Sequence, residues 1–176
     1  EWMSEVQDVG RIRCQSFRDH RGPGGIFRMI SARPASAEQL GLSRELQSLC
    51  AEPEGLVLVA GPRASGKSTL ISSFVDLINR TRNDYVITIE SQIKFAHESR
   101  SCLVSQREVR GNNEDLAMVV RAALRENPDV IVIEDLRSPE VVQLAIEAME
   151  AGHLVVGAIA AHGAARKRTP RSIGRR

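Results

Sequence analysis

From residue 55 onward, short runs of apolar and β-branched residues alternate with longer amphipathic stretches. The apolar runs predict five strands, at 56–60, 85–89, 102–105, 129–133 and 153–159. The amphipathic stretches predict three helices, one ending near 79, one over about 113–125 and one over 139–149. Strands and helices that alternate at this spacing predict an α/β fold, with a mostly parallel sheet covered by helices on both faces.

The first 54 residues follow a different pattern, in which short extended pieces surround turns. Alternation in GRIRCQSF (10–17) and the run IFRMI (26–30) predict strands, and the glycine-rich RGPGG (21–25) predicts a corner. A short helix is expected near 44–50, within a connection rich in proline and glycine. We therefore expect one domain to end in the first segment, a linker with a short helix to follow, and a second domain to come last, at 1–33, 34–54 and 55–165.

The basic charge of the chain is concentrated at its end. The 176 residues include 24 Lys and Arg against 22 Asp and Glu, and six of the basic residues lie in the tail 166–176. The rest of the chain is mildly acidic and the whole has only six aromatic residues, which argues against a broad nucleic-acid surface and against base stacking. We expect no nucleic-acid partner and a disordered tail.

The apolar runs and the cysteines exclude further classes. No apolar run approaches the roughly 20 residues of a membrane-spanning helix. Cys14, Cys50 and Cys102 are far apart and form no C-x-x-C pair, which gives no zinc signature and fits a reducing cytoplasm. We expect small buried cysteines. The start EWMSEV has no initiator Met, so we expect the sequence to be a piece of a longer chain.

The segment GPRASGKS at 61–68 matches the phosphate-binding pattern G-x-x-x-x-G-K-[ST], between a predicted strand and a predicted helix. Backbone N–H groups of such a loop surround nucleotide phosphates, and Gly61 and Gly66 permit its turns. We expect Lys67 to neutralise the phosphates and the hydroxyl of Ser68 to ligate Mg²⁺. The candidate ATP-binding residues of the loop are Gly61, Pro62, Arg63, Ala64, Ser65, Gly66, Lys67, Ser68 and Thr69.

Acidic residues follow two predicted strands, at the edge of a parallel sheet where ligands bind. The strand 129–133 leads to Glu134 and Asp135, and the strand 85–89 leads to Glu90, which would orient a water or the hydration shell of the metal. Neighbouring residues at a strand end point to opposite faces, so we expect Asp135 to face the γ-phosphate and Glu134 to face away. Glu134 as the base in its place, or ordinary acidic turns, are the alternatives.

Together these segments resemble the motor ATPases of type IV pili and type II secretion, most of all the pilus retraction ATPases. The resemblance is carried, in chain order, by GRIRCQSFRDHRGPGGIFRMI, GPRASGKST, ITIESQIKFAH, SQREV, ALRENPDVIVIEDLR and AGHLVVGAI. It implies a RecA-like P-loop NTPase core preceded by the end of a PAS-like N-terminal domain. It also implies Mg-ATP hydrolysis for twitching motility or secretion, by a cytoplasmic hexamer that acts on an inner-membrane platform protein and is peripheral at that membrane.

Three motifs depart from the pattern of the family: the Asp box, the Walker B motif and the His box, in which Ala160 takes the place of the second histidine. Its Asp box usually reads I-x-I-E-D-P-I-E, whereas here Glu90 is kept and two acids and a proline are replaced by Ser91, Lys94 and Gln92. Its Walker B motif ends in Gly-Glu-x-Arg, whereas this chain has Glu134 and Asp135 before Leu and Arg. By register Asp135 takes the catalytic position with a shorter side chain, and it would reach Mg²⁺ directly or through a water.

Histidines and arginines complete the candidate site. Gly-His of the His box is intact and we expect His153 to sense the γ-phosphate, whereas His97 is expected to be structural. By resemblance Arg13, Arg21 and Arg28 match recurrent arginines of the family, and they would bind phosphate in the same or a neighbouring subunit. A solvated basic surface is the alternative for these arginines.

Two functions therefore remain open. The first is a motor ATPase, in which a water activated near Asp135 or Glu134 attacks the γ-phosphate. The second is a nucleotide-binding subunit with weak or no hydrolysis that assembles with or regulates a competent motor, and the altered motifs favour it. A small-molecule P-loop kinase would need an arginine-rich lid, which QREVRGNNEDL (106–116) does not resemble.

Overall fold

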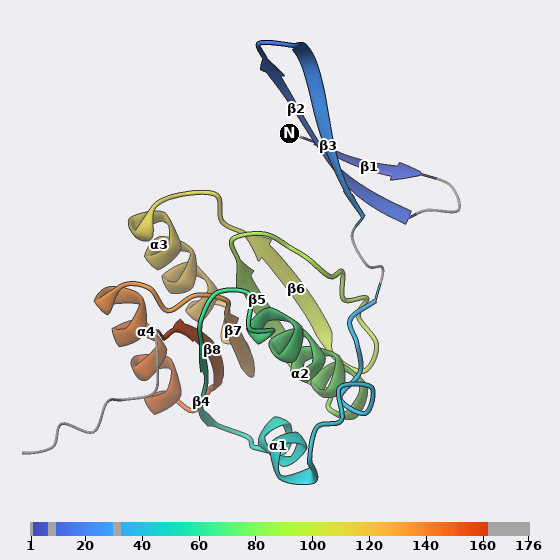
Figure 1. Ribbon diagram of the computed structural model, residues 1–176. Coiled ribbons are helices and arrows are strands. Elements are labelled where there is room, and N and C mark those ends of the chain that lie inside the picture. The colour runs from blue at the N-terminus through green and yellow to red at the C-terminus, as the bar shows by residue number, and fades with distance from the viewer. Residues whose placement is uncertain (1, 7–9, 30–32, 162–176) are drawn as a thin grey trace, which may run out of the picture.

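The computed structural model describes residues 2–6, 10–29 and 33–161, and these form two separate sheets (Figure 1). The first sheet is antiparallel, in the order β1 (Trp2–Val6), β2 (Gly10–Asp19) and β3 (Gly22–Met29). In Figure 1 it projects away from the body of the chain. The predicted basic tail 166–176 lies outside the described residues.

The hairpin between β2 and β3 turns earlier than the glycines predict. His20 and Arg21 form the turn, and the glycines that follow are paired strand residues, so the predicted corner at 21–25 is wrong. The reason is that Gly24 and Gly25 make room for the rings of Phe17 and Phe27 and do not reverse the chain. A Cβ on Gly24 would lie 2.5 Å from the ring of Phe17.

The second sheet has five strands, and every pairing in it is parallel. Its order is β4 (Gly55–Gly61), β8 (Leu154–Ala160), β7 (Val130–Ile133), β5 (Tyr85–Glu90) and β6 (Leu103–Glu108). All five strands lie where the apolar runs predict them, although β6 continues three residues further. The predicted α/β fold with a mostly parallel sheet is confirmed.

Helices cover both faces of this sheet, as expected (Figure 1). Helix α2 (Lys67–Thr81) packs on one face, and α3 (Asn113–Leu124) and α4 (Pro139–Glu150) pack on the other. The side chain of Ser138 caps α4, and proline occupies its first position.

Strict alternation along the central strands decides which residues reach each face. In β7, Val130 and Val132 pack with α2, whereas Ile131 and Ile133 pack with α3 and α4. Because side chains alternate along a strand, the next position on the α2 face after Val132 is Glu134. The side chain of Glu134 is therefore expected on the face of the sheet that α2 covers, close to the 61–68 loop that precedes this helix.

The connection before β4 packs against the α2 face. It contains α1 (Arg44–Ser48) and the 3₁₀ turn η1 (Leu49–Ala51). The guanidinium of Arg82, just after α2, donates to the carbonyl oxygens of Cys50 and Glu52 at 3.1 and 2.5 Å. Cys14, Cys50 and Cys102 are all buried free thiols, which confirms their expected packing role. Within the ranges the structure describes, no helix has the length and apolar character needed to cross a bilayer.

Candidate functional site

The 61–68 segment forms a loop at the carboxyl end of β4 and leads directly into α2. Gly66 caps the helix with φ 90°, and Ala64 is also left-handed, with φ 58°. Gly61 is not among the left-handed residues, but a Cβ there would lie 2.7 Å from Oγ of Ser65. The pattern thus predicted the need for Gly66 correctly, whereas the left-handed Ala64 has no signal in it.

Lys67 folds back over this loop. Its Nζ donates to the carbonyl oxygens of Gly61 at 2.8 Å and of Pro62 at 2.7 Å. The ammonium group therefore lies within the turn that would surround a phosphate, as expected from the motif. The remaining candidate loop residues lie in or directly after this turn, and their contacts with a nucleotide stay predictions: Arg63, Ala64, Ser65, Ser68 and Thr69.

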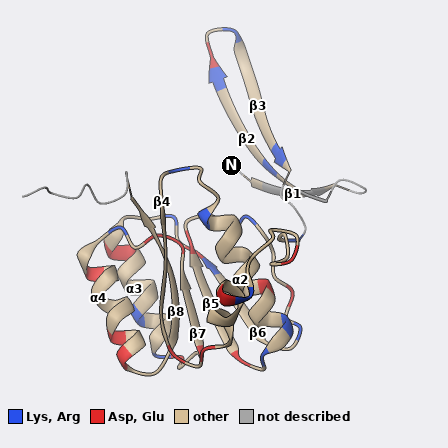
Figure 2. Cartoon of the chain, turned by 60° about the horizontal axis from the view of Figure 1, so that its bottom comes forward, with Lys and Arg blue, Asp and Glu red and all other residues tan. Residues whose placement is uncertain are grey.

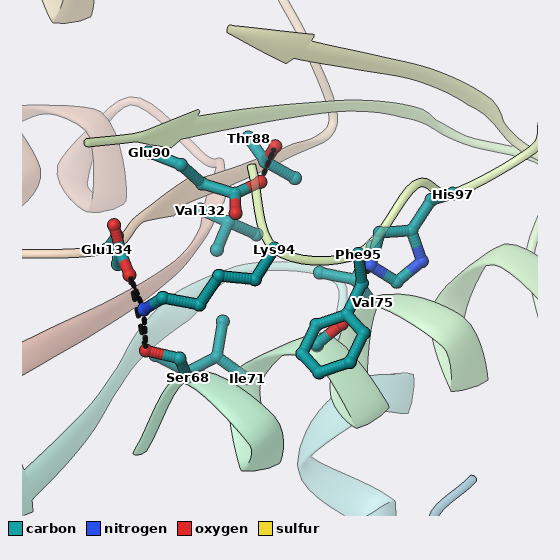
Figure 3. A pocket seen from close by; sticks show the side chains of 11 residues that line it. Ser68, Ile71, Val75, Thr88, Glu90, Lys94, Phe95, His97, Val132 and Glu134 are labelled. Carbon is teal, nitrogen blue, oxygen red and sulfur yellow. Dashed lines mark hydrogen bonds and ion pairs between the residues drawn. The ribbon is translucent and has the colours of Figure 1, made fainter. Parts of the chain in front are cut away.

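A small pocket opens beside the loop, between α2 and the carboxyl ends of β5 and β7 (Figure 3). Lys94, from the segment after β5, extends across it. Its Nζ donates to Oε1 of Glu134 at 2.6 Å and to Oγ of Ser68 at 2.9 Å. The hydroxyl of Ser68 also donates to Oε1 of Glu134, at 3.2 Å. A cation, a carboxylate and the loop hydroxyl therefore meet at one point.

The second carboxylate oxygen of Glu134 is held by Ser91. The backbone N–H and the hydroxyl of Ser91 donate to Oε2 at 2.9 and 2.8 Å. Burial by itself raises the pKa of Glu134, but the hydrogen bonds from Lys94 and Ser91 outweigh it and hold the pKa below its ordinary value. Glu134 is thus an ionised side chain in a fixed orientation.

The structure reverses the expected orientation of the two Walker B acids. Glu134, and not Asp135, faces the loop. Side chains alternate along the strand, so Glu134 points to the same face as Val132, the face that α2 covers. Asp135 forms an ion pair with Arg137 at 3.8 Å, and its side chain is 42% exposed. Register with the family located the pair correctly, but the expectation that Glu134 faces away is wrong. The expected Mg²⁺ contact of Asp135 loses its geometric basis.

Glu90 lies at the same pocket, as expected for a residue at the end of β5. Its Oε1 accepts from the hydroxyl of Thr88 at 2.7 Å and from the amide of Gln106 at 3.1 Å. Burial raises the pKa of Glu90, the two hydrogen bonds oppose this rise, and the nearby carboxylate of Glu134 adds to it. Glu90 thus supplies a second, less readily ionised carboxyl group.

His97 lines the far side of the pocket and has structural contacts (Figure 3). Its Nε2 lies 3.0 Å from Oγ of Ser72 on α2, and its backbone N–H donates to Gln106 at 2.7 Å. Burial lowers the pKa of His97 to about 4, so the ring is neutral at physiological pH. These contacts agree with the structural role expected for this histidine.

His153 is far from the loop of its own chain. It directly precedes β8, whose first residue pairs with Gly55 and whose last pairs with Gly61. Seven strand residues at about 3.3 Å each place it roughly 20 Å from the loop, at the amino ends of the parallel strands. Its buried Nδ1 lies 2.7 Å from the carbonyl oxygen of Pro128 and donates to it. The expectation that His153 senses a phosphate in this loop is wrong.

Two of the three candidate arginines lie near the altered Asp box. Arg13 and Arg28 are cross-strand partners in β2 and β3, and both line hollows against Gln92. Arg21 lies in the turn at the other end of the hairpin. Figure 2 shows basic positions at both ends of this hairpin. A role in phosphate binding stays a prediction for all three.

Comparison with known proteins agrees with this geometry. The family model described as Type II/IV secretion system protein matches residues 27–169. The chain is 41% identical to the type IV pilus retraction ATPase PilT of Pseudomonas aeruginosa, over 94% of this chain and 48% of that protein. It is 40% identical to a twitching motility protein of Neisseria gonorrhoeae, over 94% of this chain and 44% of that protein. The chain spans about half the length of these curated relatives.

Solved structures show the same likeness. A crystal structure of the pilus retraction motor PilT with bound ADP matches 93% of this chain and 48% of its own, with a TM-score of 0.84 and 39% identity. The Legionella pneumophila ATPase DotB matches 92% of this chain and 47% of its own, with a TM-score of 0.76 and 28% identity. Both proteins are described as motors or ATPases.

Proposed function

The chain belongs to the family of type II/IV secretion system proteins, and from this premise we propose that it is an ATP-binding motor subunit of a type IV pilus or a type II secretion machine. One observation carries the proposal: the 61–68 loop, which Gly66 joins to α2 and into which Lys67 folds. An anion at this helix N-terminus would meet backbone N–H groups and one ammonium group. The ADP in the solved PilT structure supports a nucleotide as the ligand.

In this proposal 55–165 is the RecA-like ATPase domain, 34–54 is a linker, and 1–33 ends a PAS-like domain. The protein would act as a cytoplasmic hexamer, peripheral at the inner membrane, against a platform protein there. Arg13 and Arg28 support an arrangement of this kind, because one hollow that they line is also lined by Lys94 and Phe95, which line the pocket beside the loop. Arg21, at the hairpin tip, would reach only a neighbouring subunit.

A resident magnesium ion does not fit the residues as they stand. Ser68 and Glu134 offer the oxygen atoms that Mg²⁺ prefers. The ammonium group of Lys94, however, lies within hydrogen-bond distance of both oxygens. The proposed ligand is therefore ATP without the expected Mg²⁺.

A second candidate function is a nucleotide-binding subunit that hydrolyses ATP weakly or not at all. The observation that favours it is the state of the two acids. Glu134 is engaged by Ser91, Lys94 and Ser68, and Asp135 is paired with Arg137. A general base must be within reach of the proton that it takes. Both oxygens of Glu134 already accept hydrogen bonds, and Asp135 faces away from the loop.

Calorimetric titration of the full-length protein with ATP tests both candidates. Lys67→Ala should weaken binding at least tenfold, because it removes the cation from the phosphate turn. Arg121→Ala, on the exposed face of α3, removes a surface charge elsewhere and should leave the affinity unchanged. Equal affinity of wild type and Lys67→Ala would contradict nucleotide binding at this loop. Phosphate release then separates the two candidates: steady turnover supports the motor, and binding without turnover supports the second.

A further inference from the structure

Three residues that depart from the family pattern form one cluster. Ser91, Lys94 and Glu134 come from two different motifs, and Lys94 and Glu134 are separated by 40 positions. The structure nevertheless joins all three: Ser91 and Lys94 each donate to the carboxylate of Glu134. An acid at 91 or at 94 would repel that carboxylate. The departures therefore fit one another and are not three separate losses.

The ammonium group of Lys94 lies where a bridging metal would lie. Its nitrogen is 2.9 Å from Oγ of Ser68 and 2.6 Å from Oε1 of Glu134, and these two oxygens are 3.2 Å apart. A Mg²⁺ bound to both oxygens at about 2.1 Å would lie within roughly 4 Å of that nitrogen. Two cations at this separation repel strongly in a partly buried site. The ammonium group and the metal thus exclude one another.

We propose that Lys94 is a built-in cation that takes the place of Mg²⁺, so that this loop binds a nucleoside di- or triphosphate without a divalent metal. This inference rests on the proposed nucleotide binding and names its cation. Figure 3 shows the Lys94 side chain crossing the pocket between Glu134 and Ser68. An ammonium group has three N–H donors, and the two acceptors of Lys94 within the described residues, Ser68 and Glu134, leave one donor for a phosphate oxygen.

The surroundings of Lys94 are suited to this role. Its side chain is 43% exposed, whereas that of Glu134 is 13% exposed, so the cation lies on the open side of the pair. Glu134 is held from behind by Ser91 and thereby keeps Lys94 directed at Ser68. Because Ser68 directly follows Lys67 at the start of α2, the ammonium group is placed beside the phosphate turn.

Titration of the full-length protein with ADP, in EDTA and then in Mg²⁺, tests the inference. The wild type should bind with affinities that differ by less than about threefold between the two conditions. Lys94→Met removes the cation and frees Ser68 and Glu134, so we expect binding in EDTA to weaken at least tenfold and Mg²⁺ to restore it. Lys94→Arg keeps a cation, and its binding should stay independent of the metal.

A second readout detects the metal itself, without nucleotide. Mn²⁺ titration followed by electron paramagnetic resonance should show a bound ion in Lys94→Met that the wild type lacks. The inference would be overturned if wild type bound ADP at least tenfold more tightly in Mg²⁺ than in EDTA. Equal Mn²⁺ binding by wild type and Lys94→Met would also overturn it. Loss of ADP binding in Lys67→Ala would still uphold the proposed function in that case. No ADP binding by the wild type in either condition would overturn both. Should Lys94→Met fail to fold, the two wild-type titrations decide alone.

Discussion

Ser91 donates both its backbone N–H and its hydroxyl to the same oxygen of Glu134, at 2.9 and 2.8 Å. This double contact fixes the carboxylate plane and turns the other oxygen toward Lys94 and Ser68. Ser91 therefore positions Glu134, and no hydrogen bond joins Ser91 to the phosphate loop among the described residues. The altered Asp box and the altered Walker B motif act as one unit.

Returning this unit to the family pattern should raise ATP turnover. The triple change Ser91→Asp, Lys94→Glu and Glu134→Gly removes the ammonium group beside Ser68 and restores carboxylates at positions 91 and 94, where the Asp box of the family has them. We expect phosphate release by the full-length protein to rise at least tenfold and to become dependent on Mg²⁺. Asp135→Glu alone should have little effect, because Lys94 and Glu134 remain. A tenfold rise from that single change would contradict this account.

The pair of Lys94 and Glu134 should be coupled in stability. Glu134→Gln and Lys94→Met should each lower the free energy of unfolding by about 1 kcal/mol, because each leaves a partly buried charge without its partner. The double variant should lose less than the sum of the two. Urea denaturation of the full-length protein measures the coupling. Strict additivity would show that the contact contributes nothing.

His97 should make stability depend on pH. Its pKa is about 4 in the folded protein and about 6.5 when exposed, so between these values the unfolded chain binds more protons. The neutral, buried ring of His97 therefore gives its full contribution to stability above about pH 6.5. As the pH falls from there toward 4, the free energy of unfolding decreases by at most about 3 kcal/mol. His97→Asn lacks this titration. Unfolding free energies of both proteins at pH 7.5 and 4.5 should converge at the lower pH, and a constant difference would contradict the shift.

The two glycines of the loop should respond differently to alanine. Gly66→Ala forces a side chain into φ 90° and should cost about 1–2 kcal/mol. Gly61→Ala meets only the hydroxyl of Ser65, which can rotate away, so it should cost less. Thermal denaturation ranks them, and adding Ser65→Ala should recover part of the loss at Gly61 alone. An equal cost at both positions would contradict the backbone argument.

His153→Ala separates the structural role from the expected catalytic one. Loss of a buried ring and its hydrogen bond to the carbonyl of Pro128 should lower the free energy of unfolding by about 1–3 kcal/mol. The affinity for ATP should not change, because the loop lies at the carboxyl ends of the strands and His153 lies at their amino ends. Calorimetry in conditions where the variant is folded measures this affinity. A tenfold loss of affinity would return His153 to the site.

The sequence predicted the succession of strands and helices along the chain from residue 55 onward, because apolar runs, caps and the phosphate loop mark the ends of these elements directly. It did not predict the partners of Glu134, because register with a family transfers positions and not side-chain contacts. Two signals were available in retrospect. Val132 packs toward α2, and because side chains alternate along a strand, Glu134 two positions later points to the same face. His153 precedes its strand, and phosphates bind where parallel strands end.

Lys67 donates to two neutral acceptors, the carbonyl oxygens of Gly61 and Pro62. These two bonds hold the ammonium group in the loop and leave its third N–H for a phosphate oxygen. That third acceptor would be anionic, and hydrogen bonds to ionised acceptors are stronger than those to neutral ones. Selection among ligands would then follow the charge that each brings, so that a neutral nucleoside gains almost nothing and each added phosphate gains more.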